Sequence, residues 1–349
     1  MRVSFVIPAR NEQAHLPRCL ASIAALERPS GPVGPVSLEI VVVDNRSTDA
    51  TAAIAAAAGA QVVSVEPGRV AVARNAGARA ASGDVLAFID ADCELPPRWL
   101  VAVLDHLETA DVVACGGSLA PPRPGATWIE RRWYALAAGD GEGAREVAWL
   151  ASFNLAVPRA AFDEVGGFDP SLVTCEDADL GYRLAARGRL VQEPGVAVVH
   201  HGESRTLRDF FRREAWRGRG TLRAMRRPGG ARWGEAKTAA VPVVFVGALA
   251  TAGMLLALGR VVPSLGCLAL SVALAMGQGW RRGVTVRHWP ASAALMSVYL
   301  LARFAGMCWP MRRVEREEAS GAAEADAAGS HAAAAPPASH VAPPMERAA

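Results

Sequence analysis

The stretch DVLAFIDAD, residues 84–92, decides how the fold of this chain is interpreted. Five apolar residues, 85–89, follow a Ser-Gly turn signal and run directly into two aspartates, which is typical of a buried strand that ends in a polar loop. Three earlier runs have the same character: VSFVI at 3–7, LEIVVV at 38–43 and QVVSV at 61–65. Nearly all-apolar strands indicate a parallel sheet that is covered on both faces.

Alanine-rich stretches between these runs predict helices at 13–25, 50–58 and 70–81. Alternating strands and helices are typical of an α/β fold with a mostly parallel, Rossmann-like sheet and flanking helices. Nucleotides bind such sheets at the carboxyl ends of the strands. The residues that follow each strand are therefore the first candidates for a functional site.

Polar, mostly acidic residues follow three of the four strands. They are residues 8–12, residues 44–49, and the pair Asp90 and Asp92. Asp49 also suits the N-cap of the helix expected at 50–58, which is a purely structural explanation. Asp90 and Asp92 lie two positions apart and can turn to one side, where Mg²⁺ or Mn²⁺ would relieve their mutual repulsion. The alternative is an ordinary loop with two solvated acids.

Five motifs occur together in one order. They are VIPARNE (6–12), VVVDNRSTDAT (41–51), ARNAGARAASGDVLAFIDAD (73–92), GGFDPSL (166–172) and EDADLGYRL (176–184). In this order and spacing they resemble the family 2 glycosyltransferases with the GT-A fold, over about residues 1–225. Asn45 stands where many members of that family have a second aspartate.

The resemblance implies a role for each of these loops. Nucleoside binding is expected from Pro8, Arg10, Glu12 and Asp44. Arg74 would contact the diphosphate, because a guanidinium suits oxyanions; the alternative is a solvated arginine on a helix surface. A divalent metal, Mg²⁺ or Mn²⁺, would be held by Asp92, with Asp90 assisting directly or through the sugar or ribose.

Two adjacent histidines, His200 and His201, end the apolar run 196–199. Strand alternation puts their side chains on opposite faces, so at most one of them can point at the metal. The resemblance implies a histidine near this position that contacts metal or diphosphate, and His200 is the preferred candidate. The alternative is a structural pair.

The Glu176–Asp177 pair supplies the catalytic base in the family. We expect Asp177 to be the base and Glu176 to be the alternative or a ligand of the acceptor hydroxyl. Thr174 and Asp177 also have the spacing of a helix capping box, a structural role that is compatible with catalysis. A helix N-terminus favours an ionised carboxylate, as a base requires. Asp179 is expected to face solvent or Arg183.

Acceptor or diphosphate contacts are expected from four residues: Asn154, Arg213, Trp216 and Arg217. Near Asn154, the residues Gly116, Trp149 and Ser152 are expected to form the pocket floor that selects the sugar.

Residues 205–237 carry eleven lysine or arginine residues against three acidic residues, although the whole chain has a net charge of only +3. A basic stretch with Phe210, Phe211 and Trp216 predicts an interfacial helix on anionic lipid headgroups. Nucleic-acid binding is the rival interpretation and is disfavoured, because no known nucleic-acid module is present.

Residues 238–259 and 261–280 carry no formal charge, and each is long enough to span a bilayer. They predict a membrane hairpin around Arg260. A third apolar segment, 289–310, contains Arg303, which costs about 2.5–3.5 kcal/mol at mid-membrane, so it is either a third span or an interfacial helix. Positive charges flank both ends of the hairpin, and the apolar run 3–7 is too short for the apolar region of a signal peptide, so we expect a catalytic domain in the cytosol at the cytoplasmic membrane.

Four parts of the chain are therefore expected. They are a GT-A catalytic domain at 1–204, an interfacial segment at 205–237, membrane helices at 238–311 and a disordered tail at 312–349. The six cysteines form neither a CxxC pair nor a dense framework, so the sequence suggests neither a zinc site nor a disulfide scaffold and fits reduced thiols.

The resemblance and this organisation together predict an inverting, metal-dependent glycosyltransferase. It would move a sugar from a nucleotide-diphosphate sugar to a hydroxyl or phosphate acceptor, expected to be lipid-linked because the site lies at the membrane. A non-catalytic nucleotide-sugar-binding membrane protein is the alternative. A sugar-phosphate nucleotidyltransferase is disfavoured, because no glycine-rich loop with a lysine follows the first strand.

Overall fold

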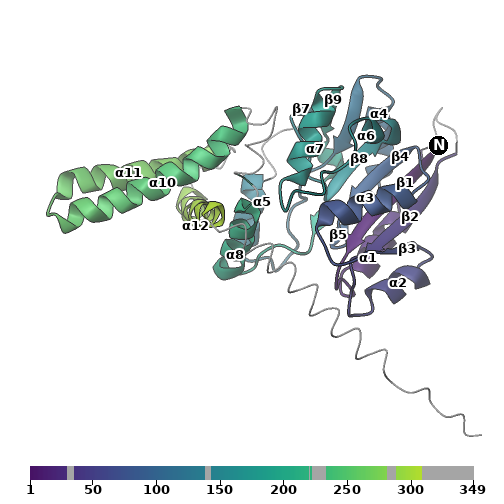
Figure 1. Ribbon diagram of the computed structural model, residues 1–349, viewed down its shortest axis with the longest axis horizontal. Helices are drawn as coiled ribbons and strands as arrows, with labels where there is room; N and C mark the ends of the chain where they lie inside the picture. Colours follow the sequence, from purple (N-terminus) through teal and green to yellow (C-terminus); the bar gives the residue numbers. More distant parts are fainter. Residues whose placement is uncertain (30–34, 138–142, 220, 222–232, 281–287, 309–349) are drawn as a thin grey trace, which may run out of the picture. The chain divides into compact units, whose positions relative to one another are not determined.

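The computed structural model describes residues 1–29, 35–137, 143–219, 221, 233–280 and 288–308. Its main sheet has eight strands in the order β3-β2-β1-β4-β8-β6-β9-β7 (Figure 1). Their bounds are β1 Arg2–Ala9, β2 Ser37–Asp44, β3 Gln61–Ser64, β4 Val85–Ile89, β6 Val112–Gly116, β7 Arg145–Val147, β8 Asn154–Pro158 and β9 Arg189–Gln192. The four strands predicted from the sequence are β1 to β4, and they pair in parallel. Strand β8 runs antiparallel to β4 and β6, and β7 runs antiparallel to β9, so the sheet is mixed but mostly parallel, as predicted.

Two hydrophobic cores cover the two faces of this sheet. Successive side chains of a strand point to opposite faces, so Phe5 and Ile7 enter one core while Val6 enters the other. Helices α1 (Leu16–Ala24) and α4 (Trp99–Leu107) line the first core, and α3 (Val70–Ala80) and α7 (Glu176–Ala185) line the second. The helices predicted at 13–25, 50–58 and 70–81 are confirmed as α1, α2 (Thr51–Ala57) and α3.

The strand register aligns the polar strand ends along one edge of the sheet. Ala9 at the end of β1 is opposite Asp44 at the end of β2, and Val6 of β1 is opposite Phe88 of β4. Asp90 and Asp92 therefore leave the sheet beside the loops that follow β1 and β2. A small second sheet adds β5 (Cys93–Glu94), which pairs antiparallel with β10 (Val199–His200) at the same edge.

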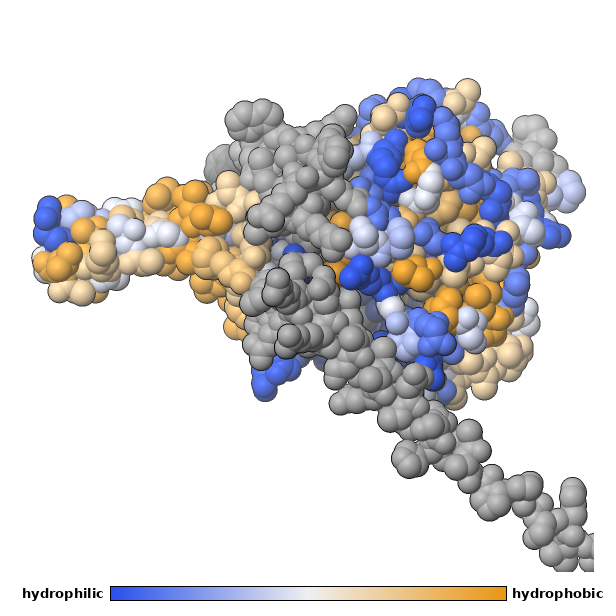
Figure 2. Space-filling view, viewed as in Figure 1, coloured by the Kyte–Doolittle hydropathy of each residue, from blue (hydrophilic) through white to orange (hydrophobic). Residues whose placement is uncertain are grey.

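Beyond the sheet domain, one helix from the middle of the chain and four helices after residue 206 form a third hydrophobic cluster. They are α5 (Trp128–Ala137), α8 (Leu207–Gly218), α10 (Trp233–Ala257), α11 (Val261–Trp280) and α12 (Trp289–Met307). By length and composition, α10 over Ala239–Ala257 and α12 could each cross a membrane, and α11 has a shorter apolar stretch, Val261–Gly277. Figure 2 shows hydrophobic residues along the α10–α11 pair, where Val243, Met254, Leu256 and Val262 are exposed. The membrane hairpin is thus weakly supported, and the third apolar segment is a helix as long as a span.

Helix α8 covers much of the segment that was predicted to lie on lipid headgroups, but one of its faces is buried against protein. Phe210 enters the third cluster, and Glu214 is only 1% exposed. The carboxylate of Glu214 lies 3.6 Å from Nε of Arg303 in α12, which also donates to the Tyr299 hydroxyl at 3.1 Å. Arg303 Nε therefore has polar partners inside the helical part, which offset part of the expected cost of this residue in an apolar helix, while its Nη1 is buried without a hydrogen-bond partner. Residues 222–232 of the basic segment and the tail 312–349 lie outside the described residues.

The crossing of α8 and α12 depends on two glycines that let the backbones approach. A Cβ on Gly306 would lie 2.0 Å from the carbonyl oxygen of Ala215, and a Cβ on Gly218 would lie 2.8 Å from that of Arg303. Gly306→Ala is expected to destabilise the protein by about 1–3 kcal/mol, because an added methyl group forces these backbones apart. The measurement is the melting temperature of the full chain in detergent.

Gly266→Ala is the matched control, because a Cβ at this α11 glycine meets nothing within 4 Å. A melting temperature of Gly306→Ala equal to that of Gly266→Ala would show that α8 and α12 do not depend on this close approach.

Candidate active site

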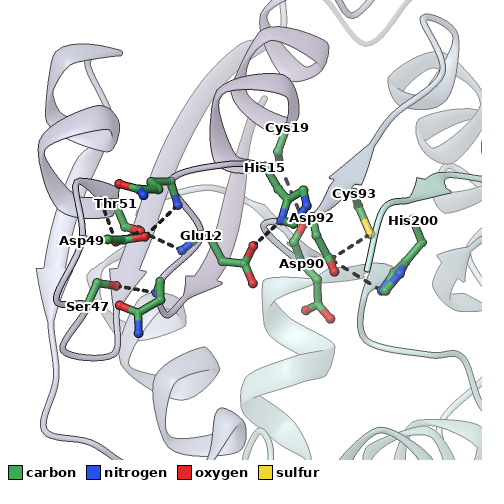
Figure 3. A network of polar contacts seen from close by, with 12 residues as sticks. Glu12, His15, Cys19, Ser47, Asp49, Thr51, Asp90, Asp92, Cys93 and His200 are labelled. Atoms are coloured by element: carbon green, nitrogen blue, oxygen red, sulfur yellow. Dashed lines mark hydrogen bonds and ion pairs between the residues drawn. The ribbon is translucent and has the colours of Figure 1, made fainter. Parts of the chain in front are cut away.

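Asp90 and Asp92 follow β4 at the polar edge, and their side chains make different contacts (Figure 3). Asp90 Oδ1 accepts a hydrogen bond from Arg74 Nη2 at 2.7 Å. Asp92 Oδ1 lies 3.5 Å from His200 Nε2. Asp90 is therefore paired with Arg74, and its expected assistance to the metal, directly or through the sugar or ribose, stays a prediction. Of the two aspartates, Asp92 is the one that faces His200.

Arg74 on α3 is buried and joins two acidic groups that are distant in sequence. Its Nη2 binds Asp90, and its Nη1 donates to Glu176 Oε1 at 2.9 Å. Burial alone would lower the pKa of this guanidinium, but the two carboxylates raise it above its ordinary value. The solvated-arginine alternative is wrong, because Arg74 is only 3% exposed, and the contact with diphosphate stays a prediction. The observed role of Arg74 is to connect the Asp90 loop to the start of α7.

Helix α7 begins at Glu176, but the predicted capping box does not form. Cys175 at the N-cap has a left-handed backbone with φ 68°, and the Thr174 hydroxyl donates to the carbonyl oxygen of Arg217 at 3.2 Å. This geometry turns Thr174 toward α8 and away from the amides of the first turn. Asp179 pairs with Arg183 at 2.6 Å, as predicted.

Asp177 differs electrostatically from its neighbour Glu176. Burial and the negative charge of Glu176 raise its pKa to about 7, although the Ala178 amide donates to its Oδ1 at 2.8 Å. The expectation that the helix N-terminus keeps this group ionised is therefore wrong in direction, because desolvation outweighs the amides. Glu176 is held by Arg74, whereas Asp177 forms no ion pair with the residues that the structure describes, which leaves it the better proton acceptor near neutral pH.

Hydrogen bonds connect the loop after β1 to the loop after β2. The Asn11 side-chain oxygen accepts from the Thr48 amide at 2.8 Å, and Asp49 accepts from the Gln13 amide at 3.1 Å and from the Thr51 amide at 3.0 Å (Figure 3). The prediction that Asp49 serves the start of the helix is thus close to the observation, although Asp49 also bridges the two loops.

The four expected nucleoside contacts lie along this edge in different environments. Asp44 is 7% exposed, and its Oδ1 accepts from the Ser47 amide at 3.0 Å, so it shapes its own loop. Glu12 binds His15 at 2.9 Å; burial raises the pKa of Glu12, and the nearby charge of Asp92 adds to this effect. Arg10 is exposed, and Pro8 lies in β1 opposite Val43.

His200 and His201 point to opposite sides of β10 and its continuation, as predicted. His201 Nε2 lies 2.8 Å from Glu94 Oε1, and its ring stacks on that of His15 at 6.1 Å between ring centroids. His200 is the one that faces Asp92.

A divalent metal fits the donor set around Asp92. One donor atom each from Asp92, Cys93 and His200 lie within 4.8 Å of one another. In addition, Nδ1 of His200 is buried without a hydrogen-bond partner. An oxygen, a nitrogen and a sulfur this close together can bind first-row divalent ions.

The residues expected to contact acceptor or sugar have several different roles. Asn154 is completely buried; its oxygen accepts from Trp99 Nε1 at 2.8 Å, and its nitrogen donates to the Val196 carbonyl at 2.7 Å. The prediction that Asn154 binds acceptor or diphosphate is therefore wrong, because its amide is used in packing. A Cβ on Gly116 would lie 2.3 Å from the Asn154 carbonyl oxygen, so Gly116 is also a packing residue.

The remaining acceptor and sugar candidates differ in exposure. Ser152 is buried, and Trp149 is 43% exposed. On α8, Arg213 and Trp216 are exposed, whereas Arg217 binds Glu214 within the α8 turn.

A cavity of about 240 Å³ adjoins His200 and was not predicted from the sequence. Its lining includes the loop 120–126 and the side chains of Glu130, Trp133, Tyr134, His200, Glu203 and Arg205. The aromatic residues of WIERRWY (128–134) are the sequence signal that points to this surface. Trp133 and Tyr134 share a cavity with His200 only because the fold brings β10 beside α5.

Comparisons with known proteins agree with this geometry. Residues 4–166 match the family model for glycosyl transferase family 2. These residues are a family 2 glycosyltransferase domain. The mannosyltransferase PcManGT from Pyrobaculum calidifontis, solved with GDP-Man and Mn²⁺, shares the fold with a TM-score of 0.63 and 22% identity over 88% of this chain and 87% of that chain.

Two curated relatives come from Mycobacterium tuberculosis. The pre-mycofactocin glycosyltransferase is 28% identical over 77% of this chain and 56% of its own length. The N-acetylglucosaminyl-diphospho-decaprenol L-rhamnosyltransferase is 46% identical over 67 residues, which are 19% of this chain and 22% of that protein. The chain thus spans little more than half the length of the first relative. The EDADLGYRL motif begins ten residues beyond the matched region, at Glu176.

Proposed function

We propose that the chain is an inverting glycosyltransferase that transfers a sugar from a nucleotide-diphosphate sugar to an acceptor hydroxyl. The observation that carries this proposal is the buried bridge of Arg74, which joins the metal-binding edge at Asp90–Asp92 to the Glu176–Asp177 pair. A leaving-group site and a proton acceptor are thereby parts of one connected arrangement. Such an arrangement suits a single displacement at a sugar carbon.

In the proposed reaction, Asp177 accepts the proton of the acceptor hydroxyl. The hydroxyl oxygen forms a bond to the anomeric carbon while the bond from that carbon to the diphosphate oxygen breaks, so the configuration inverts. The proton ends on Asp177, and the electron pair of the broken bond leaves with the nucleoside diphosphate. A pKa of about 7 suits a group that takes up a proton near neutral pH.

Asp92 and His200 would hold a divalent ion at the diphosphate. When bound, this ion supplies Lewis-acid stabilisation of the negative charge on the leaving group. The loops after β1 and β2, which are hydrogen-bonded to each other, would orient the nucleoside at the same edge. Asp44 and Glu12 would be the acidic groups that face it.

A membrane-borne acceptor is the substrate class that we propose, with the catalytic domain on the cytoplasmic side. Support comes from the membrane-length helices α10 and α12, and from the decaprenol-linked substrate in the name of the rhamnosyltransferase relative. The cavity beside His200 would receive a part of the acceptor remote from the reacting hydroxyl, because it is lined by His200 and α5 and by neither Glu176 nor Asp177.

Incubation of the full chain with a panel of nucleotide sugars tests the activity, with the released nucleoside diphosphate as the readout. Release that needs a divalent ion, and that rises when a polyprenyl-linked acceptor is added, is the expected result. Binding of a nucleotide sugar with no release under any condition would favour a non-catalytic binding protein.

Membrane attachment makes a separate prediction. Because α10 exposes Val243, Val244, Met254 and Leu256, the full chain is expected to stay with the membrane pellet after an alkaline carbonate wash and to dissolve only in detergent. Recovery of the chain in the carbonate supernatant would contradict the membrane assignment and leave the transferase proposal untouched.

A further inference from the structure

Cys93 lies at the metal-binding edge, in a position to which none of the motifs gives a role. In the small sheet, Cys93 of β5 is directly opposite His200 of β10. Side chains of directly opposite residues in an antiparallel pair lie on the same face. The Cys93 sulfur points toward Asp92, with Sγ 3.9 Å from Asp92 Oδ1 (Figure 3).

His200 gives an independent indication that a ligand belongs here. Its side chain is only 10% exposed, and its Nδ1 is buried without a hydrogen-bond partner, 3.5 Å from the Glu203 carboxylate. Its Nε2 lies 3.5 Å from Asp92 Oδ1. A buried ring with an unsatisfied nitrogen costs free energy unless something fills the site. A cation bound by Nε2 and the Asp92 carboxylate would fix the proton of His200 on Nδ1, where it can be donated to Glu203.

The three donors differ in their preference for metals. Mg²⁺ takes oxygen ligands and keeps much of its water, so it gains little from a sulfur. Zn²⁺ and other thiophilic ions bind thiolate and imidazole readily. One oxygen, one nitrogen and one sulfur donor lie within 4.8 Å of one another in this site. It can therefore bind a thiophilic ion with the sulfur, or Mg²⁺ without the sulfur.

We propose that Cys93 is a third protein donor in the Asp92–His200 site. The site would bind a thiophilic divalent cation, Zn²⁺ or Cd²⁺, through Asp92, His200 and Cys93, and it would bind Mg²⁺ without the sulfur. Thiophilic binding releases the thiol proton to solvent. Zn²⁺ is then expected to displace Mg²⁺ from the site. This inference rests on the metal site of the proposed function and assigns its ion preference.

The test is a Cd²⁺ titration of the full chain in detergent, without nucleotide sugar. The readouts are the ultraviolet charge-transfer absorption of a cadmium thiolate and the Cd²⁺ and Mg²⁺ affinities. Cys93→Ala should remove the absorption and weaken Cd²⁺ binding by at least about 10- to 100-fold, the loss that even outer-shell partners cause. The Mg²⁺ affinity should stay unchanged. Cys93→Ser keeps the size of the side chain and should give the same result if Cys93→Ala does not fold.

Cys115→Ala is the matched control, because Cys115 is also completely buried but lies in β6 and outside the donor group. Cys115→Ala should retain the absorption and the Cd²⁺ affinity. Wild-type Cd²⁺ affinity in Cys93→Ala would overturn the role of Cys93. Unchanged Mg²⁺ and Cd²⁺ affinities in Asp92→Asn would instead overturn the metal site itself, so the two failures are distinguishable.

Discussion

Asp92→Asn is expected to reduce divalent-ion-dependent sugar transfer by about 10²–10³-fold, the usual cost of losing one electrostatic partner of a developing charge. The change removes the carboxylate charge that faces His200 and keeps the size of the side chain. The loss should fall on turnover, because stabilisation of the leaving diphosphate is needed most in the transition state. The measurement is the rate of nucleoside diphosphate release as a function of metal concentration.

Asp105→Asn is the control for this change, since Asp105 is an exposed acid on α4 away from the donor group. Its transfer rate should equal that of the wild type. The metal assignment is wrong if wild-type enzyme freed of divalent ions by a chelator transfers sugar at the full rate.

Asp177→Asn should lower turnover by about 10²–10⁴-fold, the range typical of losing a general base. Donor binding should persist, because the change leaves the metal edge and the Arg74 bridge to Asp90 intact. Glu176→Gln removes one partner of a buried arginine and is expected to weaken folding as well as activity. Turnover and donor affinity, measured separately with melting temperature, distinguish the two acids.

Asp179→Asn is the matched control on the same helix turn, because its carboxylate is already used by Arg183. A small loss in Asp177→Asn, together with a large loss of turnover and a normal melting temperature in Glu176→Gln, would make Glu176 the base.

The pH dependence follows from the raised pKa of Asp177. Turnover should rise with pH up to about 7, where this group becomes ionised, and then level off. Stability should respond in the opposite sense: between about pH 4 and 7 the native state holds a proton that the unfolded chain has released, so this group disfavours folding as the pH rises. Asp177→Asn should remove both effects, and melting temperatures across this pH range measure the second.

Several features of the site could be predicted because they depend on local sequence. The apolar run 85–89 ends in two aspartates, and any parallel sheet carries such residues to its carboxyl edge. The opposite directions of His200 and His201 follow from strand alternation alone. Asp179 and Arg183 pair because they lie four positions apart on one helix.

Other predictions failed because they depend on distant partners. The alternative of a solvated Arg74 failed in this way, because Asp90 and Glu176 reach this side chain from sixteen and 102 positions away. Asn154 was expected to line the site, but Trp99 and the Val196 carbonyl use its amide. The Thr174 capping box was displaced by a bond to Arg217 of α8. No spacing rule could have foreseen these contacts.

The sequence by itself determined the α/β class, the strands that end in acidic loops and the apolar helix α10, which is long enough to cross a membrane, because periodicity and composition act over a few neighbouring residues. Only the tertiary structure decided which charges meet. It paired Asp90 with Arg74 and placed Asp92 beside His200 and Cys93. Burial raised the pKa of Asp177, although a helix N-terminus by itself lowers the pKa of a carboxyl group. Electrostatic energies inside a protein depend on distance and desolvation, and both arise only when segments far apart in the chain pack together.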